Sequence, residues 1–385
     1  MRYDFEIPLT FQHRVVFARD VFGKEVGALE ELFLTEGGRV SHVLVFVEEE
    51  LKEVFPNLLD SIEQKLSSIE SLSGQGVRVL PGGERCKLDT SVYEKACDEI
   101  AEAGIDRHSY VFAIGGGAFL DVIGFAAATV HRGVRLVRFP TTTLSQDDSG
   151  VGVKSGINKY GKKNFMGAFA VPYAVVNDFD FLHTQPEYVR RDGLVEAVKV
   201  ALVKDGSFFD WLEENQSALF ELDRETLEQA VERSAVLHAR HISEGGDPFE
   251  SGSSRPLDFG HWAAHKLEQL SDFELSHARA VSVGLALDCL YSVRVGFLKR
   301  TDAERILAVL EGLGLPLWSE FLEMRNVNGQ REVFAGLEEF REHLGGQLTI
   351  LLLREPGVGV EVHEMDEAIL EECVAEMKER VYALA

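Results

Sequence analysis

Two kinds of run alternate along the first half of the chain. Short, mainly apolar runs occur at residues 42–48, 77–80, 110–114 and 136–139. Runs of this length, bounded by turn residues, are typical of strands buried on both faces. Segments with helical spacing separate them: one follows the first run and continues to about residue 69, and the others lie at about residues 91–103 and 119–130. The alternation predicts an α/β fold in which a Rossmann-like, doubly wound parallel sheet is covered by helices.

The pattern changes near residue 179, where helical spacing becomes dominant. Helices are expected at residues 194–203, 207–219, 224–243, 261–270, 279–295, 301–313 and 365–384. A late apolar run, 347–353, has the length of a strand. We therefore predict an α/β domain over residues 1–178 and a mainly α-helical domain over residues 179–385.

Composition is ordinary for a globular protein with two cores. The 385 residues are 45% hydrophobic and 27% charged, which places the chain among such proteins. The charge balance is more informative, because 39 basic and 64 acidic residues give a formal net charge of −25. A net anion of this size argues against nucleic acid or an acidic membrane as the main partner. It leaves room for an anionic small molecule, because a few Lys and Arg residues can gather in one cleft.

The chain has four cysteines, Cys86, Cys97, Cys289 and Cys373. They lack the close spacing of a metal site, so we interpret them as reduced packing residues and expect a cytoplasmic location. The first residues do not resemble a signal peptide. The apolar runs are too short to cross a bilayer, so we expect no membrane association.

Histidines and a carboxylate form the first candidate for chemistry. His261 and His265 are four residues apart in a predicted helix, so both imidazoles lie on one face. His277 follows, and Glu196 and Lys199 are three apart in another predicted helix. A carboxylate with two imidazoles is a common ligand set for a catalytic divalent metal. Histidines at this spacing also occur by chance on amphipathic helices, so spacing alone leaves both interpretations open.

A second candidate is the triplet Gly115, Gly116 and Gly117, which lies where a strand meets a helix. Glycines there let backbone N–H groups approach a phosphate at the helix N-terminus. Leu120 occupies the third glycine position of the dinucleotide fingerprint, so a simple tight turn is the alternative. Glu48, at the end of its strand, either binds a ribose diol or belongs to a solvated acidic run.

Taken together, the motifs resemble the sugar phosphate cyclases, whose best-known member is 3-dehydroquinate synthase. The resemblance covers most of the chain. It rests on the order and spacing of residues 115–121, 131–133, 140–142, 148–154, 161–164, 196–199, 260–265 and 277. It implies an NAD-binding N-terminal domain, a helical metal-binding C-terminal domain and a homodimer.

The resemblance also implies roles for individual residues. The metal ligands would be Glu196, His261 and His277, with zinc expected and cobalt as the alternative. NAD would be bound by Glu84, Lys87, Gly115, Gly116, Gly117, Asp121, Thr141, Thr142 and Asp178, with Glu48 at the ribose. The substrate would contact Asp148, Lys154, Asn164 and Lys199. His265 would be an acid/base or phosphate-side residue, and Arg132 would reach the substrate phosphate in the neighbouring subunit.

The implied reaction is a carbon–oxygen lyase reaction on a sugar phosphate. Transient oxidation of an alcohol by NAD acidifies the adjacent C–H bond, so that phosphate can be eliminated. Re-reduction, ring opening and an intramolecular aldol step then close a carbocycle. NAD is regenerated in each turnover, and a metal holding the alcohol lowers its pKa.

Some positions of this chain differ from the synthase sequence pattern, and these differences indicate which substrate it binds. The synthase pattern Arg-x-x-Leu-Asn-x-Gly-His reads here as Arg255-Pro-Leu-Asp258-Phe-Gly-His261, with Asp258 in place of Asn and Arg255 one residue out of register. His238 stands where the synthase has Lys. The synthase substrate carries a carboxylate, which suits Arg, Lys and Asn donors. Asp258 would repel it by about 1–4 kcal/mol at moderate effective dielectric.

An Asp would instead accept hydrogen bonds from sugar hydroxyls. We therefore favour a cyclase of sedoheptulose 7-phosphate, which forms a C7 cyclitol, over a true 3-dehydroquinate synthase. An iron- or zinc-dependent alcohol or glycerol dehydrogenase is a further alternative, but it gives no reason for Arg132, Lys154, Asn164 and Lys199. A non-catalytic homologue would bind NAD and metal without turnover.

Overall fold

The computed structural model describes residues 1–23, 27–33, 40–160, 162–245, 249, 256–343 and 346–384. By its internal contacts the chain divides into two compact units. The first comprises Met1–Thr141 and Gly152–Asp180, and the second comprises Thr142–Val151 and Phe181–Ala385. The predicted single boundary after residue 178 would put segment 142–151 in the first unit. In the structure this segment packs with the second unit.

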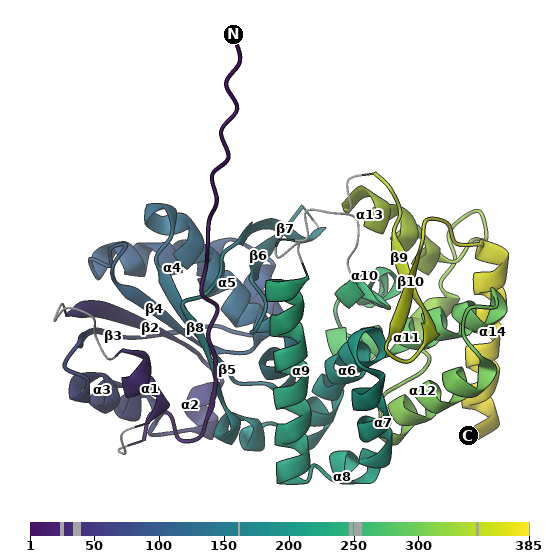
Figure 1. Ribbon diagram of the computed structural model, residues 1–385, viewed down its shortest axis with the longest axis horizontal. Coiled ribbons are helices and arrows are strands. Elements are labelled where there is room, and N and C mark those ends of the chain that lie inside the picture. Colours follow the sequence, from purple (N-terminus) through teal and green to yellow (C-terminus); the bar gives the residue numbers. More distant parts are fainter. Residues whose placement is uncertain are drawn as a thin grey trace. The chain divides into compact units, whose positions relative to one another are not determined.

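The first unit contains a six-stranded parallel sheet, which confirms the predicted α/β class (Figure 1). The strand order is β1 (Val15–Ala18), β8 (Ala174–Asp178), β5 (Arg135–Pro140), β4 (Tyr110–Gly115), β2 (Ser41–Glu48) and β3 (Leu72–Leu80). Every residue of β4 is buried. Burial on both faces explains why this strand is a continuous apolar run.

The helices of this unit are α1 (Ala28–Leu32), α2 (Leu51–Val54), α3 (Leu58–Ser68), α4 (Ser91–Glu102) and α5 (Gly117–Thr129). Residues of α4 and α5, such as Ile100 and Ile123, form one hydrophobic cluster with Phe46 and Val111 of the sheet. The predicted helix that continues to about residue 69 is interrupted after Val54. Pro56 explains the break, because the residue before a proline disfavours helical dihedral angles.

An antiparallel hairpin in the first unit was not predicted. It pairs β6 (Lys154–Lys159) with β7 (Lys162–Phe169). Its strands carry Lys and Gly in place of an apolar run, so their pattern gave no strand signal. The edge strand β1 is only four residues long and half-buried along its length, and was also missed.

The second unit is mainly helical, as predicted. Its helices are α6 (Glu187–Lys204), α7 (Gly206–Glu214), α8 (Gln216–Phe220), α9 (Arg224–Glu244), α10 (His261–Leu270), α11 (His277–Arg294), α12 (Arg300–Gly312), α13 (Ala335–His343) and α14 (Glu367–Leu384). The strand β9 (Ile350–Glu355) overlaps the late apolar run 347–353, and it pairs with β10 (Val358–Val362), which was not predicted. None of the described helices combines the length and hydropathy needed to cross a bilayer.

The buried helices α6 and α11 form the centre of this unit. The N-terminus of α10 lies directly against α11, because a Cβ atom added to Gly284 would meet the carbonyl oxygen of Gly260 at 2.0 Å. Gly260 also has a left-handed φ of 77°. Asp288 of α11 accepts hydrogen bonds from the Gly260 N–H at 3.0 Å and from Trp262 Nε1 at 2.8 Å. These contacts fix the turn that leads into His261.

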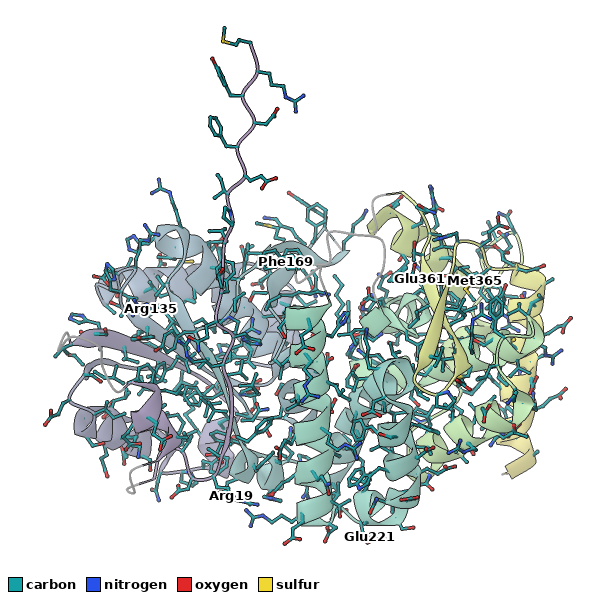
Figure 2. The ribbon with its side chains drawn as sticks, viewed as in Figure 1. Arg19, Arg135, Phe169, Glu221, Glu361 and Met365 are labelled. Atoms are coloured by element: carbon teal, nitrogen blue, oxygen red, sulfur yellow. The ribbon has the colours of Figure 1, made fainter. Side chains whose placement is uncertain are left out.

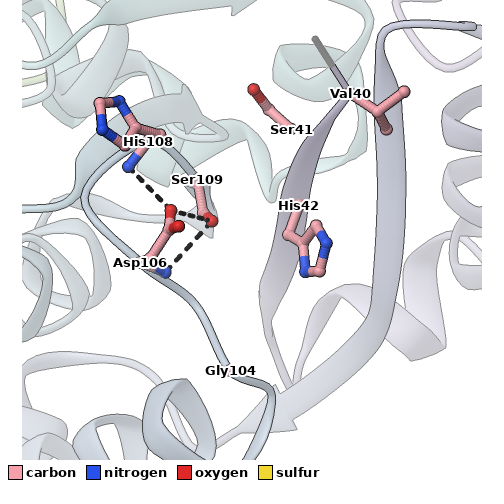
Figure 3. A pocket seen from close by; sticks show the side chains of 7 residues that line it. All are labelled: Val40, Ser41, His42, Gly104, Asp106, His108 and Ser109. Carbon is pink, nitrogen blue, oxygen red and sulfur yellow. Dashed lines mark hydrogen bonds between the residues drawn. The ribbon is translucent and has the colours of Figure 1, made fainter.

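A pocket of about 80 Å³ lies at the amino ends of β2 and β4 (Figure 3). Its polar centre is a local turn, in which Asp106 Oδ1 accepts hydrogen bonds from the His108 N–H and the Ser109 hydroxyl, both at 2.8 Å. Parallel sheets bind ligands at the carboxyl ends of their strands. The pocket therefore lies at the wrong end of the sheet for the predicted NAD site.

Candidate active site

The three predicted metal ligands come together in the second unit. Glu196 lies on α6, while His261 and His277 are the first residues of α10 and α11. The Nε2 atoms of His261 and His277 are 3.9 and 3.8 Å from Glu196 Oε1. Ligand atoms bonded to one tetrahedral zinc at about 2.1 Å stand roughly 3.4 Å apart. The three side chains therefore need only small movements to hold a divalent ion.

The remaining ring nitrogens have acceptors of their own. His261 Nδ1 lies 3.0 Å from the Phe259 carbonyl oxygen, and His277 Nδ1 lies 3.1 Å from Glu268 Oε2. An acceptor at Nδ1 favours the tautomer with the proton there, which leaves the Nε2 lone pair for a metal. Burial, helped by Lys199 and His277, holds the pKa of His261 well below its usual value. His261 is therefore neutral, the form that binds metals.

Glu196 supplies the strongest evidence that this cluster suits a cation. Its side chain is fully buried. Within the part of the chain that the structure describes, no hydrogen-bond donor reaches Oε1. Burial raises the pKa of Glu196, and the Lys199 ammonium acts against that rise. A buried carboxylate oxygen without a donor is costly unless a cation meets it.

Glu268 is a site residue that the sequence analysis missed. With His265 and His277 it forms a second group whose ligand atoms lie within 4.8 Å of one another. The His265 and His277 rings are stacked, with centroids 6.0 Å apart. Because Glu268 engages His277 Nδ1 while Nε2 faces Glu196, the geometry favours Glu268 as the residue that orients His277. Its position three residues after His265 on α10 was the available signal.

Asp148, Lys199 and His238 form a charged group beside Glu196, His261 and His277. Asp148 Oδ1 lies 3.7 Å from Lys199 Nζ and 3.0 Å from His238 Nδ1. Burial opposes ionisation of Asp148, but Lys199 and His238 hold its pKa below the usual value. Burial likewise disfavours the Lys199 cation, and Asp148 and Glu196 outweigh it and raise its pKa. Lys199 therefore stays charged at neutral pH.

Asp148 reaches this group through η3, a π-helical turn at Ser145–Ser149. The turn is held against α9, where the Ser234 hydroxyl donates to the Asp147 carbonyl oxygen at 3.1 Å. Asp147 itself is fully buried and was not singled out from the sequence. Burial, followed by the charges of Asp148 and Glu196, raises its pKa well above the usual value.

Asp258 ends the short 3₁₀ turn η5 (Pro256–Asp258), three residues before His261. It is half-buried and contributes to the raised pKa of Lys199. The structure thus brings Asp258 to the charged group around Lys199. Arg255, the other departure from the synthase pattern, lies outside the described residues.

In the first unit, Lys87 connects several residues predicted to bind cofactor or substrate. Its ammonium donates to Asp121 Oδ2 and to Asn164 Oδ1, both at 2.6 Å. Burial disfavours this cation, but Asp121 and Glu84 raise its pKa above the usual value. Asn158, which was not predicted, donates to Glu84 Oε1 at 3.3 Å and accepts from the Asn164 N–H at 2.8 Å.

Glu48 links two turns at the carboxyl ends of the strands. Its Oε1 accepts from the Gly83 N–H at 2.8 Å, and its Oε2 accepts from the Gly116 N–H at 2.6 Å. Burial raises the pKa of Glu48. A Cβ atom on Gly82 would lie 2.0 Å from Glu48 Oε1, so a side chain there would displace the Glu48 carboxylate from its two hydrogen bonds. A ribose-binding role for Glu48 stays a prediction, as does phosphate binding by Gly115, Gly116 and Gly117.

Three further predicted cofactor residues make contacts within the chain. The Thr141 N–H donates to the Gly115 carbonyl oxygen at 3.1 Å, and Thr142 Oγ1 lies 2.8 Å from Ser145 Oγ. Asp178 Oδ2 accepts from the Val21 N–H at 2.8 Å. Burial raises the pKa of Asp178 to about 6. Their roles in binding NAD stay predictions.

Arg132 and Lys154 are exposed. His131 and Arg132 both have left-handed φ values, 53° and 62°. Consecutive non-glycine residues in this conformation cost about 1–2 kcal/mol each and mark functional turns. Lys154 begins β6, and Arg138, which is fully buried, donates to the Lys154 carbonyl oxygen at 2.8 Å. The sequence signal for Arg138 was an arginine inside an apolar strand.

Comparisons with known proteins place the chain in a family. Residues 77–191 match the family model for the 3-dehydroquinate synthase N-terminal region, and residues 193–331 match the model for its C-terminal region. A 3-dehydroquinate synthase from Halorhodospira halophila is 38% identical over 304 residues, covering 77% of this chain and 82% of that protein. One from a Geobacter species is 41% identical over 252 residues, covering 64% of this chain and 69% of that protein.

Solved structures give the same fold. A 2-epi-5-epi-valiolone synthase from Streptomyces hygroscopicus subsp. jinggangensis 5008, described with NAD⁺ and Zn²⁺ bound, has a TM-score of 0.86 and 25% identity, covering 98% of this chain and 100% of that one. A 2-deoxy-scyllo-inosose synthase has a TM-score of 0.76 and 19% identity, covering 94% and 96%.

A probable glycerol dehydrogenase from Sinorhizobium meliloti 1021 shares only the fold. Its TM-score is 0.59 at 14% identity, with 95% of this chain and 96% of that one covered. By contrast, the 3-dehydroquinate synthase family models and the curated relatives match the sequence of this chain across both units. The chain therefore belongs to the 3-dehydroquinate synthase-like sugar phosphate cyclases.

Proposed function

We propose that this enzyme is an NAD- and metal-dependent carbon–oxygen lyase that converts sedoheptulose 7-phosphate to a C7 cyclitol. The observation that carries the proposal is the contact of His238 with Asp148 at 3.0 Å. His238 stands at the position where the resemblance to the synthase expects a lysine. The group around Lys199 thus has an imidazole in place of a second ammonium.

The charges of this group argue against an acidic substrate. Lys199 is its buried cation, and three carboxylates already act on it, those of Asp148, Glu196 and Asp258. A substrate carboxylate would add a fourth anion with no further lysine to balance it, and like charges at short range are unfavourable. The hydroxymethyl group of sedoheptulose 7-phosphate is neutral. Asp258 can accept a hydrogen bond from its hydroxyl.

The other predicted residues have the following proposed roles. Glu196, His261 and His277 hold the metal, with zinc preferred and cobalt as the alternative, and the first unit holds NAD. When bound, these two groups stabilise an alkoxide and exchange a hydride with the substrate. Lys154, Asn164 and Lys199 orient the sugar phosphate, and His265 moves a proton at its phosphate side. The exposed Arg132 supports a homodimer in which it reaches the partner's substrate.

The free cysteines support a cytoplasmic location for the enzyme. All four cysteines are free, and three of them are buried. Unpaired cysteines are typical of reducing compartments, so we propose that the enzyme works in the cytoplasm.

A second candidate function is that of 3-dehydroquinate synthase. It is supported by curated relatives of that name at 38% and 41% identity. A phosphate-release assay with NAD and zinc decides between the two. We expect release from sedoheptulose 7-phosphate and none from 3-deoxy-arabino-heptulosonate 7-phosphate. Release from the acid alone would show that Arg255 still serves its carboxylate, and NADH production from simple alcohols would indicate a dehydrogenase.

Substituted variants, measured in the same assay, test the proposed roles of His238 and Asp258. The double substitution His238→Lys with Asp258→Asn restores the synthase-like charges. We expect it to lower kcat/KM for sedoheptulose 7-phosphate by about 10-fold to 100-fold and to allow turnover of the acid. His241→Lys, one turn further along α9, is the matched control. Equal effects of His238→Lys and His241→Lys would contradict the assigned role of His238.

A further inference from the structure

The hairpin of β6 and β7 contains a bulge that the proposed function leaves unused. Pairing of β6 with β7 is regular up to Ile157 and resumes at Lys159. Between them, Asn158 alone faces residues 163–165 of β7. A bulge of this kind redirects side chains and is frequent beside active sites. Figure 1 shows the two strands side by side, and Phe169, which ends β7, is labelled in Figure 2.

Asn164 lies at the centre of the bulge, in an unusual backbone conformation. Its φ is 53°, in the left-handed region that asparagine tolerates better than most residues. Because the bulge interrupts the ladder here, the Asn164 N–H needs another acceptor. Asn158 Oδ1 accepts it at 2.8 Å, and Lys87 Nζ donates to Asn164 Oδ1 at 2.6 Å. The backbone of Asn164 is thus held by Asn158 and its side chain by Lys87.

Both contacts of Asn164 lead back to one short element, the 3₁₀ turn η1 (Glu84–Lys87). Lys87 is the last residue of this turn. Glu84 is the first, and its Oε1 accepts a hydrogen bond from Asn158 Nδ2 at 3.3 Å. The exposed fractions of Asn158 and Lys87 are only 6% and 3%, so water competes little for these hydrogen bonds. The position of the bulge is therefore tied to the position of η1.

The amide group of Asn158 has one favourable orientation. Its oxygen faces a donor, the Asn164 N–H, and its nitrogen faces an acceptor, the Glu84 carboxylate. A rotated amide would set its nitrogen against the N–H and its oxygen against the carboxylate, and both pairs repel each other. The link therefore needs a donor and an acceptor on the same short side chain. Aspartate has no donor when it is ionised, and alanine has neither group.

We propose that Asn158 is a positioning residue that transmits the binding of a dinucleotide at η1 to Asn164 in the bulge. The inference rests on the proposed function, in which Glu84 and Lys87 contact NAD and Asn164 contacts the sugar phosphate. A ligand that fixes η1 fixes Lys87 directly and Asn158 through Glu84. The bulge is then ordered before the substrate arrives, which lowers the cost of binding it. Because coupling between two ligands is reciprocal, the sugar phosphate should also tighten NAD binding.

Hydrogen exchange of the backbone, followed by mass spectrometry on the whole chain, tests the link with NAD as the only ligand. In the wild type, we expect saturating NAD to slow exchange in residues 162–169 by about 10-fold. Asn158→Asp keeps the acceptor for the Asn164 N–H but sets a carboxylate against Glu84, so the protection by NAD should be lost. Equal protection in both proteins, or bound NAD without protection in the wild type, would overturn the proposal.

A compensating substitution separates a broken link from a damaged fold. Asn158→Asp combined with Glu84→Gln restores a donor and an acceptor with their roles exchanged, since the glutamine amide can donate to the new carboxylate. At saturating NAD, the double variant should recover the protection that Asn158→Asp loses. Asn57→Asp, the same change at an exposed position of the first unit, is the control. A double variant that is protected no better than Asn158→Asp would overturn the link through Glu84.

Kinetic measurements distinguish failure of this inference from failure of the proposed function. Asn158→Asp should raise KM for sedoheptulose 7-phosphate by about 10-fold and change kcat little, because it disturbs the binding of the sugar and leaves the reacting groups in place. NAD-dependent protection without phosphate release from any sugar phosphate would support the link and refute the proposed function. Phosphate release with the same kcat/KM in wild type and Asn158→Asp would refute the link alone.

Discussion

Glu268 is placed to orient the imidazole ring of His277. It is almost fully buried, and its Oε2 accepts a hydrogen bond from the ring nitrogen of His277 that faces away from Glu196. An acceptor placed in this way fixes the tautomer and the rotation of a ligating imidazole and raises its basicity. The metal affinity of the cluster should therefore depend on a residue that does not touch the metal.

Substitution of Glu268 tests this dependence. We expect Glu268→Ala to weaken zinc binding by about 10-fold to 100-fold, and Glu268→Gln, which keeps an acceptor but loses the charge, to weaken it less. Competition with a chromophoric chelator gives the affinities. Glu274→Gln, at an exposed position shortly after α10, is the control. Equal zinc affinity in Glu268→Ala and wild type would show that His277 needs no orienting partner.

Asp288 should make stability depend on pH. Burial raises its pKa to about 7, although the Trp262 and Gly260 N–H groups act against that rise. Between the ordinary pKa of an Asp and pH 7, the folded state holds a proton that the unfolded state has released. The contribution of Asp288 to the free energy of unfolding is therefore largest at low pH, and it declines as the pH rises towards 7.

Denaturant unfolding of wild type and Asp288→Asn between pH 4.5 and 7.5 isolates the effect. The difference in unfolding free energy, wild type minus variant, should fall with rising pH by at most about 4 kcal/mol. The variant removes this titration and keeps the others. A difference that stays constant would mean that Asp288 is ionised throughout and that its two donors outweigh its burial.

At the scale of elements, the sequence was most informative where one face or both faces of an element are buried. The helix α10 begins and ends at the predicted residues, 261 and 270. The strands β2 and β4 were found because they are continuous apolar runs. The hairpin of β6 and β7 was missed because β6 has a single apolar residue, Ile157, and β7 begins with Lys162, Lys163 and Asn164, while β1 was missed because it is short.

The same distinction applies to the site. Glu196, His261 and His277 could be named because the resemblance fixed their positions, and the structure brings them together. Asn158 could not, because its role depends on a hydrogen bond to Glu84, 74 residues away in the chain. Glu268 and Arg138 stood at positions that could have been noticed, but the sequence did not show that they would meet His277 and the Lys154 carbonyl oxygen. A buried polar partner leaves no periodic signal. The sequence shows which residue types are present but not which acceptor each donor meets.

The crossing of α10 and α11 should be intolerant of any side chain at Gly284. A methyl group there would overlap the Gly260 carbonyl oxygen and push the first turn of α10, with His261, away from α11. We expect Gly284→Ala to cost about 2–4 kcal/mol of unfolding free energy and to weaken zinc binding. Gly27→Ala, where a Cβ atom would meet nothing within 4 Å, is the control. Equal midpoints of denaturation would contradict this close packing.

For the whole molecule, metal should act as a stabilising ligand. The Glu196 cluster joins three helices of the second unit, and an ion bound only in the folded state raises stability by about 2.7 kcal/mol at 100 times its Kd. Zinc added to chelator-treated protein should raise Tm in a concentration-dependent way. Glu196→Gln should abolish most of that rise. A Tm that zinc does not change would show that these helices pack without an ion.

The threading of segment 142–151 has a consequence for recombination between relatives. Asp148 packs with the second unit, yet its codon lies between those of β5 and β6, which belong to the first. A chimera made by one crossover after residue 178 would inherit Asp148 from one parent and Lys199 and His238 from the other. Gene fragments cut at residue 178 would thus take the residues of one charged group from two different parent proteins. If this group sets the substrate preference, as we propose, a chimera keeps one parent's preference only when residues 142–151 come from the same parent as the C-terminal fragment.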